Sequence, residues 1–156
     1  MDLYTLLKVV HVIGAMVLFG TGVGIAFFML MSHRSGDVRV IAHVAGIVVI
    51  ADTIFTANAA VLQPITGAWL AHLAGLPMKR GWIGLSLILY AGVGLCWLPV
   101  VWIQLRMRDL AREAMRTGAP LPLAYVRLFR IWVALGVPAF AAMLAILALM
   151  VVKPGF

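Results

Sequence analysis

The chain has 156 residues, 65% of them hydrophobic, with twelve Lys and Arg against five Asp and Glu and a formal net charge of +7. A soluble domain is nearer half apolar, so this composition and a mean hydropathy of +1.12 exclude a soluble globular protein and indicate one bilayer-embedded domain over residues 1–156. The basic residues stand at the ends of apolar runs and do not alternate with aromatic residues, so we expect the lipid bilayer as partner and no nucleic acid.

Four apolar runs are each long enough to cross a bilayer, which takes about 20 residues. They predict an all-α integral membrane bundle of four transmembrane helices, at about 3–31, 40–70, 82–105 and 125–152. The first run follows Asp2 instead of a basic segment and passes residue 30, so it indicates a spanning helix, not a cleavable signal peptide. Pro64 lacks a backbone donor, and we expect the second helix to be kinked or broken near it.

The third helix is expected to continue into the cytoplasm as a charged helical extension. The stretch from Arg106 to Arg116 carries opposite charges three residues apart, which support a helix, in the pairs Asp109/Arg112 and Glu113/Arg116. Gly118 and Pro120 then stop it. Because the loop 106–124 is the richest in arginine, we expect it to be cytoplasmic, with both termini outside a bacterial inner membrane that the chain crosses several times.

Polar side chains inside a bilayer are costly, so they are the best pointers to function in a membrane sequence. The second helix carries four that we consider: Asp52, Thr56, Asn58 and Gln63. Asp52, Thr56 and Gln63 follow i, i+4, i+11 spacing and share a helix face, which we expect to look into the bundle. Asp52 has two readings: a hydrogen-bonded acid that ties helices together, or a proton or cation site.

His11 is the other polar outlier, about 10 Å inside the outer end of the first helix. It can be a neutral histidine hydrogen-bonded across helices, a ligand of haem iron, or a proton relay. His72, at the outer end of the second helix, is a weaker candidate for a second axial ligand, because it lies about 10 Å shallower than His11. The glycine pairs Gly20/Gly24 and Gly92/Gly94 predict close helix packing.

The run Leu6–Gly14, followed by Phe19-Gly20, resembles the first helix of HemJ-type protoporphyrinogen oxidases and copper-resistance-protein-D-like membrane domains. In HemJ proteins this histidine is understood to ligate haem b, so the resemblance implies haem b on His11. The resemblance ends after Gly81-Trp82, where HemJ proteins carry a histidine and a lysine and this chain carries neither. It therefore does not imply a second ligand or the oxidase activity.

The whole chain is similar to a bacterial family of predicted four-helix integral membrane proteins of unknown function. The similarity is carried by the segments 51–56, 62–67, 97–102 and 118–122. It implies the fold and leaves three functional hypotheses. The first is a haem-b protein with a redox or electron-transfer role. The second is a non-enzymatic accessory or assembly subunit of a membrane complex, or a homo-oligomer. The third is a small transporter that uses the polar face of the second helix.

Overall fold

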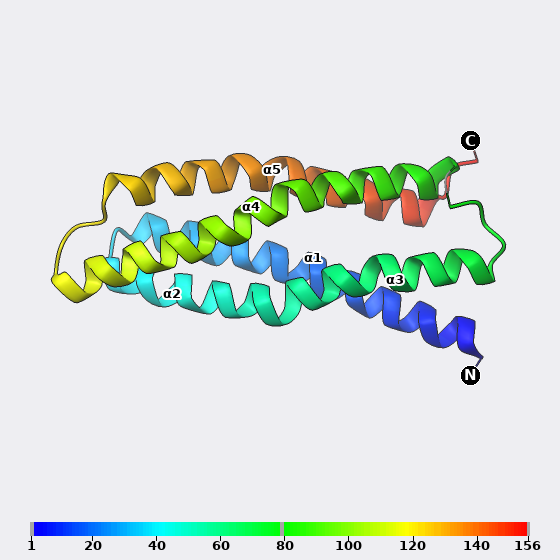
Figure 1. Cartoon of the computed structure of the whole chain (residues 1–156), viewed down its shortest axis with the longest axis horizontal. Helices are drawn as coiled ribbons and strands as arrows, with labels where there is room; N and C mark the ends of the chain where they lie inside the picture. Colours follow the sequence, from blue (N-terminus) through cyan, green and yellow to red (C-terminus); the bar gives the residue numbers. More distant parts are fainter. Residues whose placement is uncertain (1, 79, 156) are drawn as a thin grey trace.

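The computed structural model describes residues 2–78 and 80–155, and this part of the chain is helical without any strand. Its elements are α1 (Leu3–Ser35), α2 (Val38–Ala51), the π-helical turn η1 (Asp52–Thr56), α3 (Ala57–Leu73), α4 (Gly81–Thr117) and α5 (Leu123–Val152). Because α2, η1 and α3 form one continuous helix, four helices are long and apolar enough to cross a membrane. The predicted all-α bundle of four spanning helices is confirmed (Figure 1).

The two ends of the bundle are built differently. At one end lie the α1–α2 turn and the α4–α5 loop, which we call the loop end. Both termini and the α3–α4 connection lie at the other, the terminal end (Figure 1). Near the loop end α2 packs against both α1 and α4, whereas toward the terminal end α1 pairs with α3, and α4 pairs with α5. The bundle is therefore closed at its loop end and divided into two helix pairs at its terminal end.

Short polar caps and left-handed glycines fix the helix ends. Asp2 precedes α1 and accepts a hydrogen bond from the Thr5 backbone N–H at 2.7 Å, which lowers the pKa of the Asp2 carboxyl. Gly36 (φ 68°) ends α1 and Gly118 (φ 67°) ends α4, both in the left-handed region that favours glycine. The expected extension of the third helix is thus confirmed, with its end at Thr117.

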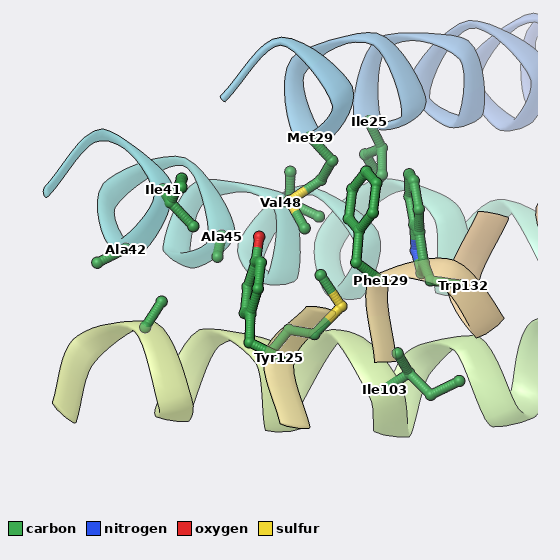
Figure 2. Packing of buried hydrophobic residues seen from close by; sticks show 12 residues of the cluster. Ile25, Met29, Ile41, Ala42, Ala45, Val48, Ile103, Tyr125, Phe129 and Trp132 are labelled. Carbon is green, nitrogen blue, oxygen red and sulfur yellow. The ribbon is translucent and has the colours of Figure 1, made fainter. Parts of the chain in front are cut away.

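A buried apolar cluster holds the four helices together at the loop end. Met29 of α1, Met107 of α4 and Tyr125 of α5 are completely buried there. Figure 2 shows Tyr125, Phe129 and Trp132 of α5 standing between α1 and α2 on one side and α4 on the other. His33, at the end of α1, stacks on the Phe129 ring with centroids 3.8 Å apart. Elsewhere many large apolar side chains are exposed, as lipid-facing positions should be.

The irregular turn of the second helix lies before Pro64, not at it. The helix runs through Pro64 to Leu73, so it is not broken there. The change in backbone hydrogen bonding is at η1, where the Ala57 N–H bonds to the Asp52 carbonyl, five residues back. The Asn58 amide, which is exposed, donates to the Ile54 carbonyl at 2.6 Å and satisfies this turn locally.

Of the two charge pairs expected on α4, one is confirmed and the other is corrected. Glu113 and Arg116 form the expected ion pair at 2.6 Å, but Asp109 pairs with Arg108 at 2.8 Å. Arg112 turns instead toward α2, where its Nη2 would be 3.0 Å from a Cβ on Gly46. Arg112 is exposed as a residue, but its long side chain reaches along the neighbouring helix α2.

The glycine pairs do not pack against other helices as expected. Within the described residues, a Cβ on Gly20, Gly92 or Gly94 would have no neighbour within 4 Å, and one on Gly24 would meet only Phe28 of its own helix. The close approach that glycine permits occurs between α1 and α3, as described below. A GxxxG spacing in the sequence does not say which helix face will be covered.

Candidate functional site

A cavity of about 760 Å³ lies where the two helix pairs separate. Its walls come from α1, α4 and α5, with η1 and the start of α3 contributing further residues. Along α1 it extends from Leu18 to Leu30, which is about 18 Å at 1.5 Å per residue. Ligand sites in proteins commonly have volumes of about 300–1,000 Å³, so this space is large enough for a small elongated molecule.

The cavity wall is apolar except for a small group of side chains. They are Asp52 and Thr56 of η1, Tyr90, Trp97 and Gln104 of α4, and Trp132 of α5. Asp52 is buried, and the Trp97 indole Nε1–H donates to its Oδ1 at 3.3 Å. Single π turns inside α-helices occur frequently at functional sites, and here the π turn carries the two polar residues of the second helix that border the cavity.

Two buried polar atoms on residues of this wall have no hydrogen-bond partner in the part of the chain that the structure describes. They are the Thr56 hydroxyl oxygen and the indole Nε1 of Trp132. Leaving such a group unpaired costs about 1–3 kcal/mol, and buried polar groups in native proteins are nearly always bonded. Both atoms are closed off from the cavity by neighbouring groups, however, and the Thr56 hydroxyl lies beside the Asp52 carboxyl, so a molecule in the cavity would not reach them without a side-chain movement.

The Tyr90 hydroxyl already has a hydrogen-bond partner within the protein. Pro64 has no N–H, so the Ala60 carbonyl loses the helical donor that would otherwise reach it from four residues ahead. The Tyr90 hydroxyl donates to this carbonyl at 2.5 Å. Tyr90 thus ties α4 to α3 and compensates for the proline.

This compensation can be tested by a double-mutant cycle. Tyr90→Phe is expected to destabilise the protein by about 1–2 kcal/mol, because the Ala60 carbonyl is left without a partner. In a Pro64→Ala background, the new N–H of residue 64 satisfies that carbonyl, so the same change should cost clearly less. Reversible unfolding in mixed micelles measures the four free energies. Equal costs in the two backgrounds would contradict the assignment.

His11 lies between α1 and α3, next to the glycine that permits their close approach. Its Nδ1 is 2.8 Å from the Thr66 hydroxyl oxygen, and that hydroxyl donates to the Leu62 carbonyl at 2.7 Å. Since the hydroxyl has one proton, we assign the Nδ1 proton to the histidine, which leaves Nε2 with a free lone pair. The ring lies over Gly67, where a Cβ would be 3.2 Å from its Cε1.

Gln63 of α3 also contacts α1, about one helical turn away from Thr66 and Gly67. Its amide nitrogen donates to the His11 carbonyl at 2.9 Å, and a Cβ on Gly14 would stand only 2.4 Å from that nitrogen. Gln63 was expected on the inner face with Asp52 and Thr56, and all three are buried. Gln63 contacts α1, however, whereas Asp52 and Thr56 border the cavity, so the polar face serves two separate places.

The structure does not bring His11 and His72 together. From Gln63 to His72, α3 makes about two and a half turns, so His72 is exposed on the side of α3 away from α1. His11 is not among the described residues that line the cavity. Within residues 2–78 and 80–155, no group of three or more His, Cys, Asp and Glu side chains could hold a metal ion. One copy thus offers a single histidine nitrogen at this place, Nε2 of His11, and the described residues do not bring a second histidine to it.

In the sequence, Tyr90 and Gln104 stand out as polar residues of the third helix and Trp97 as a deep aromatic residue, but none of the three was assigned to a site. Tyr90, Trp97 and Gln104 recur every seven residues along α4, which is about two helical turns and places them on one face. This seven-residue spacing is the sequence pattern that could have identified them as neighbours on one helix face. Trp132 of α5 is buried beside the cavity.

The comparison with known families supports the membrane assignment. The family model described as "Predicted integral membrane protein (DUF2269)" matches residues 5–154, and the chain belongs to this family. No curated protein and no solved structure matches the chain. The comparisons thus give an integral membrane protein, and they do not extend the resemblance to HemJ proteins.

Proposed function

Starting from an integral membrane protein of this family, we propose that the chain binds a lipophilic small molecule inside the bilayer, in the cavity between its two helix pairs. The observation that carries the proposal is the cavity of about 760 Å³ itself, whose otherwise apolar wall includes the buried polar side chains of Asp52 and Gln104. An apolar pocket with a few convergent polar groups is the usual form of a small-molecule site.

The position of the cavity supports entry from the lipid. Phe19 of α1 and Phe140 of α5 both border it, and their rings stack with centroids 5.4 Å apart and an interplanar angle of 22°. These two side chains close the gap between α1 and α5, so a molecule dissolved in the bilayer would enter between these helices when the two rings separate. A ligand of this kind does not need an aqueous route.

Native mass spectrometry of protein released from micelles tests the proposal. We expect an adduct of small-molecule mass that survives mild release from detergent and is lost when the cavity is filled by mutation. Protein that carries no adduct, and that takes none up from membrane lipid extracts, would refute the proposed function.

A second candidate is haem b on Nε2 of His11, which the first-helix resemblance implies and the hydrogen bond of Nδ1 to Thr66 supports. A metal-bound histidine commonly uses its other nitrogen for such a bond, which fixes the ring. When bound, haem would supply a one-electron redox centre. The residues of one copy offer a single histidine nitrogen at this place, so we expect a five-coordinate, high-spin haem.

An absorption spectrum of protein from haem-supplemented cells, oxidised and then reduced with dithionite, tests this candidate. His11→Ala should remove the Soret band, and His72→Ala should leave it unchanged. Sharp low-spin bands in the reduced protein would contradict the single ligand, and colourless protein would end the candidate.

The arginines of the loop end support a further part of the proposal, which is the orientation of the protein in the membrane. We place the loop end in the cytoplasm of a bacterial inner membrane and both termini outside, by the positive-inside rule. An accessory subunit docked through residues 106–116, a homo-oligomer and a transporter remain predictions. A pull-down in mild detergent tests the first two, and loss of liposome flux in Asp52→Asn tests the third.

A further inference from the structure

We infer that two copies of the chain associate in the membrane through the outer face of α3, where the carboxamides of the two Asn58 side chains bond to each other. Of the four polar residues considered on the second helix, Asn58 alone is exposed, and it is not among the described residues that line the cavity. The inference therefore concerns a different face of the protein and does not depend on the ligand of the cavity.

A contact between helices places Asn58 close to the middle of the bilayer. A span takes about 20 residues, so the middle of the span that α4 begins at Gly81 falls near residue 91. At this level the Tyr90 hydroxyl bonds to the Ala60 carbonyl of α3. Asn58 lies two residues from Ala60, which is about 3 Å along the helix axis. Its exposed side chain therefore faces hydrocarbon, where water and lipid head groups supply no hydrogen bonds.

The carboxamide of Asn58 has an unused acceptor and a weakly used donor. Its Nδ2 donates to the Ile54 carbonyl at 2.6 Å, whereas its second contact, to the Thr53 carbonyl, is at 3.5 Å, the outer limit of a hydrogen bond. Among the described residues, none donates to its Oδ1. An unpaired polar atom in hydrocarbon is costly, so the arrangement favours a partner that both accepts and donates.

A second copy of the chain is such a partner, because a carboxamide is complementary to itself. The second N–H of each Asn58 can donate to Oδ1 of the other, while the bond to the Ile54 carbonyl is kept. Copies inserted in the same direction are related by a two-fold axis along the membrane normal, which brings both Asn58 side chains to the same depth. Hydrogen bonds of this kind between asparagines support the association of membrane helices.

The residues around Asn58 can pack in such a dimer. Ile54, Leu62 and Ile65 stand four residues before it and four and seven residues after it, so they share its helix face. They are 54%, 46% and 54% exposed. The face is thus apolar around one central polar group, which fixes the register of the two helices.

Cysteine cross-linking in liposomes tests the position of the interface. Cys96→Ala first removes the single cysteine of the chain. In that background Ile65→Cys places a thiol two turns from Asn58, and oxidation at a low protein-to-lipid ratio should link two copies. Ile88→Cys is the control, because Ile88 is 71% exposed on α4 at a similar depth. Linkage through Ile88→Cys equal to that through Ile65→Cys, no linkage in either, or linkage of Ile65→Cys to a different protein in native membranes in place of a second copy, would overturn the inference.

Energy transfer between donor-labelled and acceptor-labelled copies in liposomes tests the hydrogen bonds. Asn58→Leu should weaken association by about 3- to 30-fold, the range for hydrogen bonds between membrane helices. Asn58→Gln keeps a donor and an acceptor and should restore most of it. Thr53→Val is the control, because it removes another exposed polar group of the same turn. Unchanged association in Asn58→Leu, or an equal loss in Thr53→Val, would overturn the inference. The cross-linking variants retain Asn58, so a folding defect in Asn58→Leu cannot imitate their result.

Discussion

Gly94→Leu is expected to lower ligand occupancy at least about tenfold, which corresponds to about 1.4 kcal/mol, without destabilising the bundle. Gly94 borders the cavity, and a Cβ there would meet no described atom within 4 Å. A leucine side chain can therefore extend into the space that the ligand needs. Leucine also favours a helix interior over glycine by about 0.5–1 kcal/mol, so the helix itself should gain stability.

Gly92→Leu provides the control for this change. Gly92 stands two residues away on the same helix, is exposed, and also has open space where its Cβ would be, but it is not among the described cavity residues. Native mass spectrometry measures occupancy, and unfolding in mixed micelles measures stability. If Gly94→Leu keeps its ligand, the cavity is not the binding site. If both variants lose it, a change in α4 itself is responsible.

The spanning helices could be predicted from the sequence because the bilayer imposes a simple requirement on them. A run of about 20 apolar residues satisfies it, and the chain contains four such runs. The helical extension of α4 beyond the apolar run could also be predicted, since Gly118 and Pro120 mark its end. The α1 and α4 helices extend past the predicted apolar bounds, because polar residues at a bilayer surface can continue a helix.

The cavity could not be predicted because it depends on which faces are left uncovered. The sequence spacing of a glycine pair is the same whether the glycines contact a neighbouring helix or border an open space. Gly94 of the pair Gly92/Gly94 borders the cavity, whereas Gly14 and Gly67, which belong to neither predicted pair, carry the close contact of α1 with α3. The π turn at η1 has no sequence signature either, since its register depends on tertiary packing.

The partner of His11 also lies outside what local sequence can supply. His11 was singled out as a polar residue in an apolar run, which is a local signal. Its bond to Thr66 crosses from α1 to α3 and depends on the register of the two helices. That register is set by small contacts such as Gln63 over Gly14. The residue type of His11 therefore indicated a candidate site, whereas its tautomer follows only from the packing of α1 against α3.

Met107→Ala should destabilise the protein by about 2–5 kcal/mol, the range for truncation of a buried methionine. Met107 is completely buried in the loop-end core, where four helices meet. In a bilayer, helices associate through close packing because lipid tails are as apolar as the side chains, so a void at this place removes contacts that lipid cannot replace. Unfolding in mixed micelles measures the loss.

Met115→Ala on the same helix is the matched control, because Met115 is 46% exposed and its truncation should change stability by less than about 0.5 kcal/mol. Equal effects of the two changes would mean that the loop-end core does not hold the bundle together. The pair also separates stability from binding. Met107 supports the closed end of the bundle and is not among the described cavity residues, so its loss should loosen the fold without altering the polar wall. Gly94→Leu should do the reverse, which is the behaviour of a bundle whose closed end supplies stability and whose divided end supplies the site.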